Sequence, residues 1–277
     1  MAPSVPGKTA KRSIVFVDND RFFLEALTDF LGEKGFVVYT AQDGLEALSV
    51  IREVMPDYIL LDIVIPKIDG GRVCAAVRQN ERLRHIPIIA FSGLSPQDYH
   101  LFPGLKADAY VAKGPLTTAV ENVLRVIRRF EEGGRENTEG QVLGYENFRP
   151  RQIVNELLHE RRHLAAILRA FGLAVLELSR DGRIVMANSR ACEVLGKKDG
   201  LLFGEFFSSL FPPSCRPGVQ DILTDLVRSP KPAHFQTMLD LGGVEIPIRL
   251  AAIVEESECT GLLVTFAGKE PKPEGGL

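Results

Sequence analysis

Hydrophobic positions in the first 130 residues follow two alternating periods. Short runs rich in β-branched residues are separated by stretches in which apolar side chains recur every three or four positions, the period of a helix. This alternation predicts strand–helix–strand units and a doubly wound α/β domain with a five-stranded parallel sheet. Several runs are apolar at successive positions, which is typical of strands buried on both faces. The predicted strands are 14–17, 37–40, 58–62, 88–92 and 109–112.

The last hundred residues have a different order of elements. Two short strands joined by Asp181-Gly182 predict a β-hairpin, because Asp-Gly favours a tight turn. Helical patterns follow, and three more strands come after them, so we expect an α+β domain with an antiparallel sheet. The predicted strands are 174–178, 183–186, 234–240, 245–254 and 261–266, and the helices are 190–195 and 219–227.

A polar, glycine-rich stretch separates these two parts and is predicted to be a linker. The segment after it carries apolar residues on one helical side. It is either a short coiled-coil seam or an amphipathic helix that packs on its own domain. The expected organisation is a disordered tail 1–11, an α/β domain 12–130, a linker 131–151, a connecting helix 152–171, an α+β domain 172–268 and a disordered tail 269–277.

Composition and charge indicate the compartment and the partners to expect for this protein. The net charge of −3 gives no reason to expect binding to nucleic acid or to an anionic membrane. The four cysteines are scattered without a CxxC pair, as is usual in a reducing compartment. No apolar run approaches the ~18 residues that a membrane span needs. We therefore expect a cytoplasmic protein with no membrane or nucleic-acid partner.

Four of the five strands of the first domain end beside chemically active side chains. These are Asp18, Asp62, Ser92 and Lys113. Because the carboxyl ends of parallel strands meet at one edge of a sheet, we expect the four to converge. Carboxylates gathered there would repel one another unless a cation such as Mg²⁺ lay among them. A phosphoryl group on one carboxylate would be neutralised by the metal, the lysine and the hydroxyl.

The motifs around these residues are FVDND, LLD followed by IPKIDG, AFSG and YVAKGP. They resemble the receiver domain of bacterial two-component response regulators, and the resemblance covers residues 12–130. It implies a flavodoxin-like fold in which Asp62 accepts a phosphoryl group from a sensor histidine kinase or a phosphotransfer protein. It also implies a signalling phosphoprotein that is not an enzyme, apart from catalysing its own phosphotransfer and dephosphorylation.

The same resemblance implies a Mg²⁺ site made by Asp18, Asn19, Asp62 and the backbone carbonyl of Val64. Asn19 stands where receivers usually have a second acidic ligand. An amide oxygen can coordinate Mg²⁺ but brings no charge, so we expect weak metal binding. Asp20 is expected to cap the following helix.

By resemblance, Lys113 and Ser92 contact the phosphoryl group, and Ser92 and Tyr110 form the conformational switch. Gly114 separates Lys113 from Pro115, whereas receivers usually have lysine followed directly by proline. The acceptor Asp62, the lysine Lys113 and the hydroxyl of Ser92 are all still present despite this departure.

Two alternatives remain open from the sequence. A receiver that needs no phosphate could serve as a docking scaffold through the surface beside Tyr110. Alternatively, Asp18 and Asp20 could be the nucleophile and general acid of a phosphatase of the haloacid-dehalogenase type. That interpretation leaves Asp62 unexplained. The family also needs a later acidic pair at the end of another strand, whereas Lys113 is followed by one helix and a linker.

Residues 160–268 are similar to PAS domains, through ILRAFGLAVLELSRDGRIVMANSRACEVLG and GEFFSSLF. The resemblance implies a sensor or dimerisation module, whose ligand is unidentified or absent. The chain shows no helix-turn-helix, so we expect its output to be contact with a downstream protein. A homodimer through helix 152–171 and this domain is one form of that output. We expect four phenylalanines to pack the core: Phe203, Phe206, Phe207 and Phe211.

Overall fold

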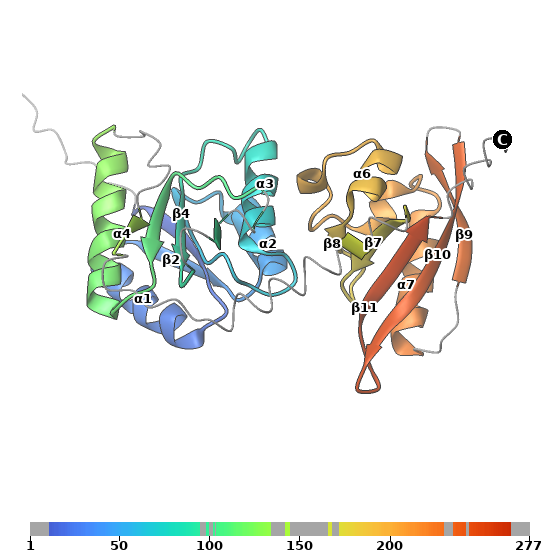
Figure 1. Cartoon of the computed structure of the whole chain (residues 1–277), viewed down its shortest axis with the longest axis horizontal. Coiled ribbons are helices and arrows are strands. Elements are labelled where there is room, and N and C mark those ends of the chain that lie inside the picture. Colours follow the sequence, from blue (N-terminus) through green and yellow to red (C-terminus); the bar gives the residue numbers. More distant parts are fainter. Residues whose placement is uncertain are drawn as a thin grey trace, which may run out of the picture. The chain divides into compact units, whose positions relative to one another are not determined.

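The computed structural model describes residues 11–94, 98–99, 102, 104–133, 142–144, 166–167, 172–229, 235–241 and 244–266. The chain divides into two compact units, one built mainly from residues up to 150 and the other mainly from residues after 150 (Figure 1). Each unit contains one sheet.

The sheet of the first unit is parallel throughout, in the order β2-β1-β3-β4-β5-β6. The five predicted strands are all present, as β1 (Ser13–Val17), β2 (Val37–Ala41), β3 (Tyr58–Leu61), β4 (Ile88–Ser92) and β5 (Ala109–Ala112). The fold class predicted for this domain is therefore confirmed. Its helices are α1 (Arg21–Glu33), α2 (Gly44–Val54), α3 (Gly70–Gln79) and α4 (Leu116–Glu131).

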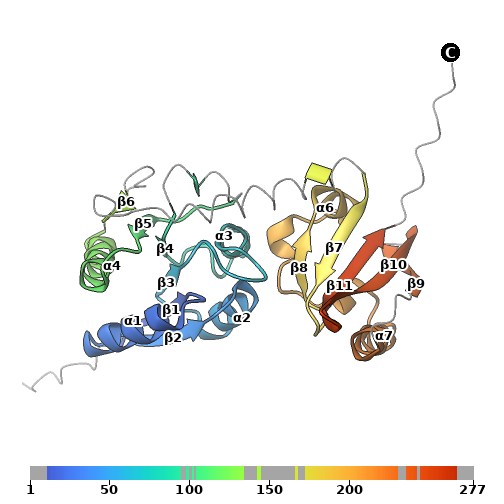
Figure 2. The same ribbon diagram turned by 60° about the horizontal axis from the view of Figure 1, so that its bottom comes forward.

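Helices cover this sheet on both faces (Figure 2). On one face, Phe16 of β1 lies in a cluster with Leu27 of α1 and Val123 of α4. The alternate strand residues, such as Val15 and Ile59, point to the other face and have no exposed surface. Burial on both faces explains why these strands are apolar at successive positions.

Two features of the first unit differ from a plain strand–helix alternation. Residues 93–108 connect β4 to β5, and in their described part Asp98 and Tyr99 form a short turn while no α-helix is present. A sixth strand, β6 (Val142–Leu143), pairs in parallel with β5. It lies in the stretch that we predicted to be a linker, because two residues are too short for a recognisable strand pattern.

Two glycines close the turn that follows β3. A Cβ atom on Gly70 would lie 2.5 Å from the carbonyl oxygen of Asp62, and one on Gly44 would lie 1.9 Å from that of Ile68. These neighbours are backbone atoms, which cannot rotate away. The turn can therefore pack against the starts of α2 and α3 only because Gly44 and Gly70 have no side chain.

An ion pair joins the same turn to α2. Lys67 Nζ lies 2.6 Å from Asp43 Oδ2. The other carboxylate oxygen of Asp43 accepts hydrogen bonds from the backbone N–H groups of Leu45 and Glu46, which caps the helix. One aspartate therefore caps α2 and holds the turn.

The sheet of the second unit is antiparallel, in the order β8-β7-β11-β10-β9. The α+β arrangement predicted for this part of the chain is confirmed. Its elements are β7 (Ala174–Leu178), β8 (Ile184–Ala187), α6 (Ser189–Leu195), the 3-10 turns η3 (Asp199–Leu201) and η4 (Phe207–Leu210), α7 (Arg216–Arg228), β9 (Phe235–Leu241), β10 (Val244–Glu255) and β11 (Glu258–Phe266).

The helices of the second unit share a core with one face of its sheet. Phe203, Phe207 and Phe211 are buried as expected, and the rings of Phe207 and Phe211 meet edge to face. Phe206 is 43% exposed, so the prediction was wrong there, and Arg183 lies over its ring. Phe207 and Phe211 belong to the core cluster that packs against the sheet.

Asn188 joins α6 to the sheet. Its Oδ1 accepts hydrogen bonds from the N–H groups of Ala191 and Val175, and its Nδ2 donates to the carbonyl of Leu173. The predicted connecting helix 152–171 lies outside the described residues except for Ala166 and Ile167, which are helical. Among the described residues, no helix has the length and apolar character to cross a membrane.

We predict that Gly70→Ala destabilises the first unit by about 3 kcal/mol, because the new methyl group meets backbone atoms that are held by the sheet. Gly32→Ala is the matched control. A Cβ atom there has nothing within 4 Å, and alanine is favoured in a helix over glycine by roughly 1 kcal/mol. Urea unfolding followed by circular dichroism measures both; equal stability of Gly70→Ala and wild type would contradict the prediction.

Candidate functional site

One ammonium group links two carboxylates at the edge where the strands of the first sheet end. Lys113 Nζ lies 2.6 Å from Asp62 Oδ2 and 2.7 Å from Asp18 Oδ2. Asp18 has no exposed surface and Asp62 has 5%. Because all three groups are withdrawn from water, the ion pairs are strong, and so is the cost of leaving any of the charges unpaired.

The topology of the sheet brings these three residues together. Asp18 and Asp62 directly follow β1 and β3, which are neighbours, and Asp62 N–H donates to the carbonyl of Val17. Lys113 directly follows β5, and its N–H donates to the carbonyl of Ser92 at the end of β4. The convergence predicted from strand ends is what the fold produces.

Two aromatic rings lie near the ammonium group of Lys113. Its Nζ lies 5.2 Å from the ring centre of Phe23 and 5.6 Å from that of Phe91, within the range of cation–π attraction. Sequence analysis placed Phe91 in a predicted strand and did not connect Phe23 or Phe91 with the lysine. The signal was present only in three dimensions, because the rings come from separate elements.

The charges of this site act on one another. Burial raises the pKa of Asp18 to about 6, and the neighbouring Asp62 adds to the increase, while Lys113 opposes it. Burial also acts to lower the pKa of Lys113, but the charges of Asp62 and Asp18 outweigh it, and the net shift is upward. The positive charge of Lys113 therefore does not fully offset the increase in the pKa of Asp18 that burial and the second carboxylate cause.

The remaining predicted metal ligands lie at the same edge but do not join this contact. Asn19 and Asp20 are exposed. Asp20 Oδ1 accepts from Phe22 N–H at the start of α1, which is the capping role expected for it. Val64 N–H donates to Asp62 Oδ1 at 3.2 Å and so orients the carboxylate.

The oxygen donors at this site are of the type that binds a hard cation. Among the described residues, Lys113 is the only partner of the buried Asp18 Oδ2, so this oxygen has capacity for a second positive neighbour. Two carboxylates, the Asn19 amide and a backbone carbonyl are all oxygen donors of the type that Mg²⁺ prefers. The described residues contain no cluster of three or more acidic, histidine or cysteine side chains that could hold a metal.

The two predicted switch residues lie on the neighbouring strands β4 and β5. Ser92 is buried, and its hydroxyl accepts a hydrogen bond from Leu94 N–H. Tyr110 is half-buried and its ring stacks on that of Tyr99, with centres 5.1 Å apart. Tyr99 was missed by sequence analysis, because it lies in a connection without a periodic pattern.

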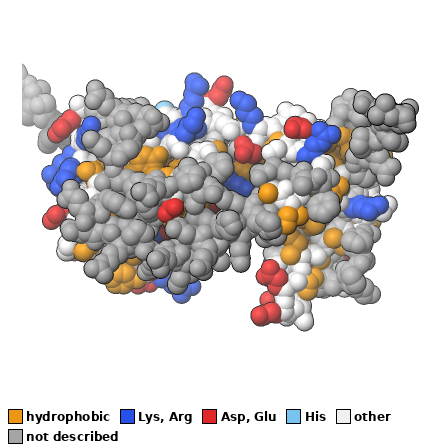
Figure 3. Space-filling view, viewed as in Figure 1, with side chains coloured by type: hydrophobic (Ala, Val, Ile, Leu, Met, Phe, Trp, Pro, Cys, Tyr) orange, Lys and Arg blue, Asp and Glu red, His pale blue; other side chains and the backbone are white. Residues whose placement is uncertain are grey.

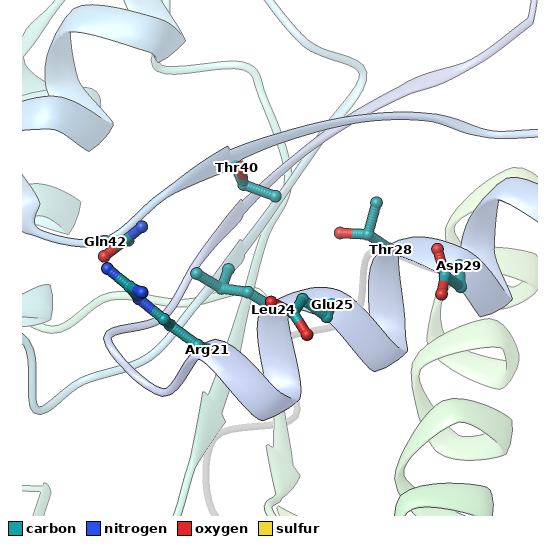
Figure 4. A pocket seen from close by; sticks show the side chains of 7 residues that line it. All are labelled: Arg21, Leu24, Glu25, Thr28, Asp29, Thr40 and Gln42. Atoms are coloured by element: carbon teal, nitrogen blue, oxygen red, sulfur yellow. The ribbon is translucent and has the colours of Figure 1, made fainter.

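A separate groove lies between α1 and the end of β2 (Figure 4). Its volume is about 650 Å³, and its walls are mainly polar. None of the residues of the acceptor site lines it. The lining residues are Arg21, Leu24, Glu25, Thr28, Asp29, Thr40 and Gln42.

We predict that Asp18→Asn stabilises the protein at pH 7 when metal ions are chelated. The folded-state pKa of Asp18 lies near 6, above its ordinary value of 3.8. The folded protein therefore binds this proton more tightly than the unfolded chain, and stability falls as pH rises through this window. The gain at pH 7 is at most about 3 kcal/mol, and it disappears below about pH 4.

Urea unfolding in the presence of EDTA at pH 4 and pH 7 measures this difference. Asp20→Asn is the control and should leave the stability unchanged, since asparagine caps a helix as well as aspartate does. A variant Asp18→Asn that is less stable than wild type at pH 7 would show that the ion pair with Lys113 outweighs the cost of burial.

Comparison with known proteins agrees with the geometry. The chain matches the family model of the response regulator receiver domain over residues 14–119 and that of the PAS fold over residues 168–266. It is 31% identical to the "Probable transcriptional regulator ycf27" of Guillardia theta over 181 residues, which cover 62% of this chain and 68% of that protein. It is also 31% identical to the polar-differentiation response regulator DivK of Brucella ovis over 103 residues, which cover 37% of this chain and 84% of DivK.

Among solved structures, the chain is similar to the signal receiver domain of a signal transduction histidine kinase from Syntrophus aciditrophicus. The identity is 26% and the TM-score 0.40, over 48% of this chain and 98% of that one. On the family models and the two curated relatives, the chain belongs to the response regulators of two-component signalling, with a receiver domain followed by a PAS fold.

Proposed function

We propose that Asp62 is the phosphoacceptor of this response regulator and that a sensor histidine kinase or a phosphotransfer protein supplies the phosphoryl group. The observation that carries the proposal is the contact of Lys113 Nζ with both Asp62 and Asp18 at the ends of three strands. Lysine is a direct neutraliser of phosphoryl charge, and this one is held in place by the carboxylate that would be modified.

The transfer follows from the orientation of the Asp62 carboxylate. An oxygen of Asp62 attacks phosphorus, a P–O bond forms, and the P–N bond of the donor phosphohistidine breaks with its electron pair returning to the imidazole. Val64 N–H binds Asp62 Oδ1 and Lys113 binds Oδ2, so the carboxylate is oriented before the donor arrives. Positioning and charge neutralisation are the main requirements of phosphoryl transfer.

Mg²⁺ bound by Asp18, Asn19, Asp62 and the Val64 carbonyl would neutralise charge on the transferred group. With two carboxylates in this set, we expect weak binding, consistent with the uncharged and exposed Asn19. Ser92 is the hydroxyl that would donate to a phosphoryl oxygen, since it ends the strand beside Lys113. Tyr110 would respond to its movement.

For the output, we infer contact with a downstream protein through the PAS domain, with a homodimer through helix 152–171 and this domain as one form of it. The proposed boundaries are a receiver at 12–130, a linker at 131–151, the connecting helix and a PAS domain at 172–268. On the face shown in Figure 3, basic and acidic side chains of the described residues are interspersed, unlike the single-sign surface typical of nucleic-acid binding.

The test is phosphate uptake from acetyl phosphate, followed by intact-protein mass spectrometry. We predict that wild type gains one phosphoryl group in the presence of Mg²⁺ and that Asp62→Asn gains none. Asp20→Asn is the matched control, because its side chain lies near the same strand edge and only caps α1. It should behave like wild type.

Other outcomes would point elsewhere. Equal uptake by Asp62→Asn and wild type would exclude Asp62 as the acceptor. No response of wild type up to millimolar Mg²⁺ would favour a phosphate-independent docking scaffold. Steady turnover of a phosphomonoester that Asp18→Asn abolishes and Asp62→Asn spares would favour a phosphatase.

A further inference from the structure

The free edge of β5 in the receiver domain is covered by a segment from beyond the domain's last helix. β6 pairs in parallel with β5, with Val142 opposite Tyr110 and Leu143 opposite Val111. Figure 2 shows β6 beside β5, on the side where α4 lies. The segment therefore occupies an edge that would otherwise present unpaired backbone N–H and C=O groups.

Side chains fix this segment at two points. Leu143 packs against the core cluster formed with α1 and α4. Gly144 has φ of +83° and lies directly over Asn122 of α4, so that a Cβ atom would be 2.7 Å from Asn122 Nδ2. Asn122 is a polar residue with only 5% exposure. This close approach is possible only because residue 144 is glycine.

The strand that β6 covers is also the strand that ends in the acceptor site. Lys113 directly follows β5, and Ala112 pairs with Ser92 of β4. Tyr110, the residue opposite Val142, is stacked on Tyr99. Any rearrangement of Lys113 or Ser92 toward a phosphoryl group on Asp62 therefore acts on β5, and β6 is bonded to its other edge.

The contact of β6 is also small. It consists of a two-residue strand and a half-buried leucine, whereas the neighbouring strands are four or five residues long and almost fully buried. Elements with few buried contacts open first when their support changes. A change in β5 therefore favours release of β6 over a tighter fit.

We propose that the β5 edge and the Asn122 region of α4 form a docking surface for residues 142–144, and that phosphorylation of Asp62 releases this segment. The inference rests on the proposed phosphorylation. While β6 is docked, the receiver holds the chain at residue 144. Gly133, the described residue that precedes this segment, lies 11 residues before Gly144 along the chain. Release therefore adds at most about 40 Å to the reach of the chain between α4 and the PAS domain.

Release changes what the PAS domain can reach. A longer tether lowers the effective concentration of one domain at the other and widens the volume that each samples. It also uncovers the β5 edge and the apolar contact of Leu143. By linkage, the same coupling makes an undocked segment favour the phosphorylated state.

Hydrogen–deuterium exchange of the peptide that contains residues 142–144 tests this. In wild type treated with acetyl phosphate and Mg²⁺, intact mass first establishes that a phosphoryl group is present. We expect exchange in this peptide to become at least about fivefold faster on phosphorylation, the lower end of usual coupling between sites. The peptide that contains β1 should not change.

Two glycine variants separate docking from backbone strain. Gly144→Val places a side chain against Asn122, and Gly133→Val places one in open space at nearly the same φ, +85°. Without phosphate, Gly144→Val should exchange as fast as the phosphorylated wild type, and Gly133→Val should resemble unphosphorylated wild type. Leu143→Ser is a second undocking variant, should Gly144→Val fail to fold. Undocked variants should also hold a larger phosphorylated fraction than wild type at the same acetyl phosphate concentration, because the coupling is reciprocal.

The outcomes distinguish a failure of this inference from a failure of the proposed function. If wild type takes up the phosphoryl group and the exchange of 142–144 is unchanged, the release is wrong and the acceptor assignment stands. If wild type takes up no phosphoryl group, the proposed function fails, and this inference fails with it. If Gly144→Val exchanges no faster than Gly133→Val, the docking contact with Asn122 is wrong.

Discussion

The ammonium group of Lys113 is shared by two buried carboxylates, and the rest of the receiver domain is arranged around that contact. Three strands must end at the same edge for it to form. The ammonium group also lies near the rings of Phe23 and Phe91. The neutralisation is incomplete, since the pKa of Asp18 is still raised to about 6. Burial is the main cause of this increase, so a second cation beside Asp18 would stabilise its charged form.

The two sides of this contact are held differently. On the acceptor side, Gly44 and Gly70 let the turn after β3 pack directly on the backbone, and the ion pair of Lys67 with Asp43 fixes it further. On the β5 side, the described part of the β4–β5 connection contains no α-helix, and the outer strand has only two residues. The acceptor side is therefore packed closely against backbone atoms, whereas the strand beyond β5 makes only a short contact.

The family assignment does not identify the output of the protein. One similar protein is named a transcriptional regulator and another a polar-differentiation response regulator, so similarity to the receiver does not specify the output. In this chain the receiver is joined to a PAS fold, whose core includes Phe207 and Phe211.

The amino-acid sequence by itself determined the two fold classes and most strands to within one to three residues, because apolar periodicity reports burial directly. It also predicted that Asp18, Asp62, Ser92 and Lys113 gather at one edge, since each follows or ends a parallel strand. Only the tertiary structure decided what depends on distance between separate elements. The rings around Lys113, the glycines against backbone carbonyls and the packing of Gly144 on Asn122 are examples. Neither periodicity nor spacing along the chain records which elements meet, so these contacts required the folded protein.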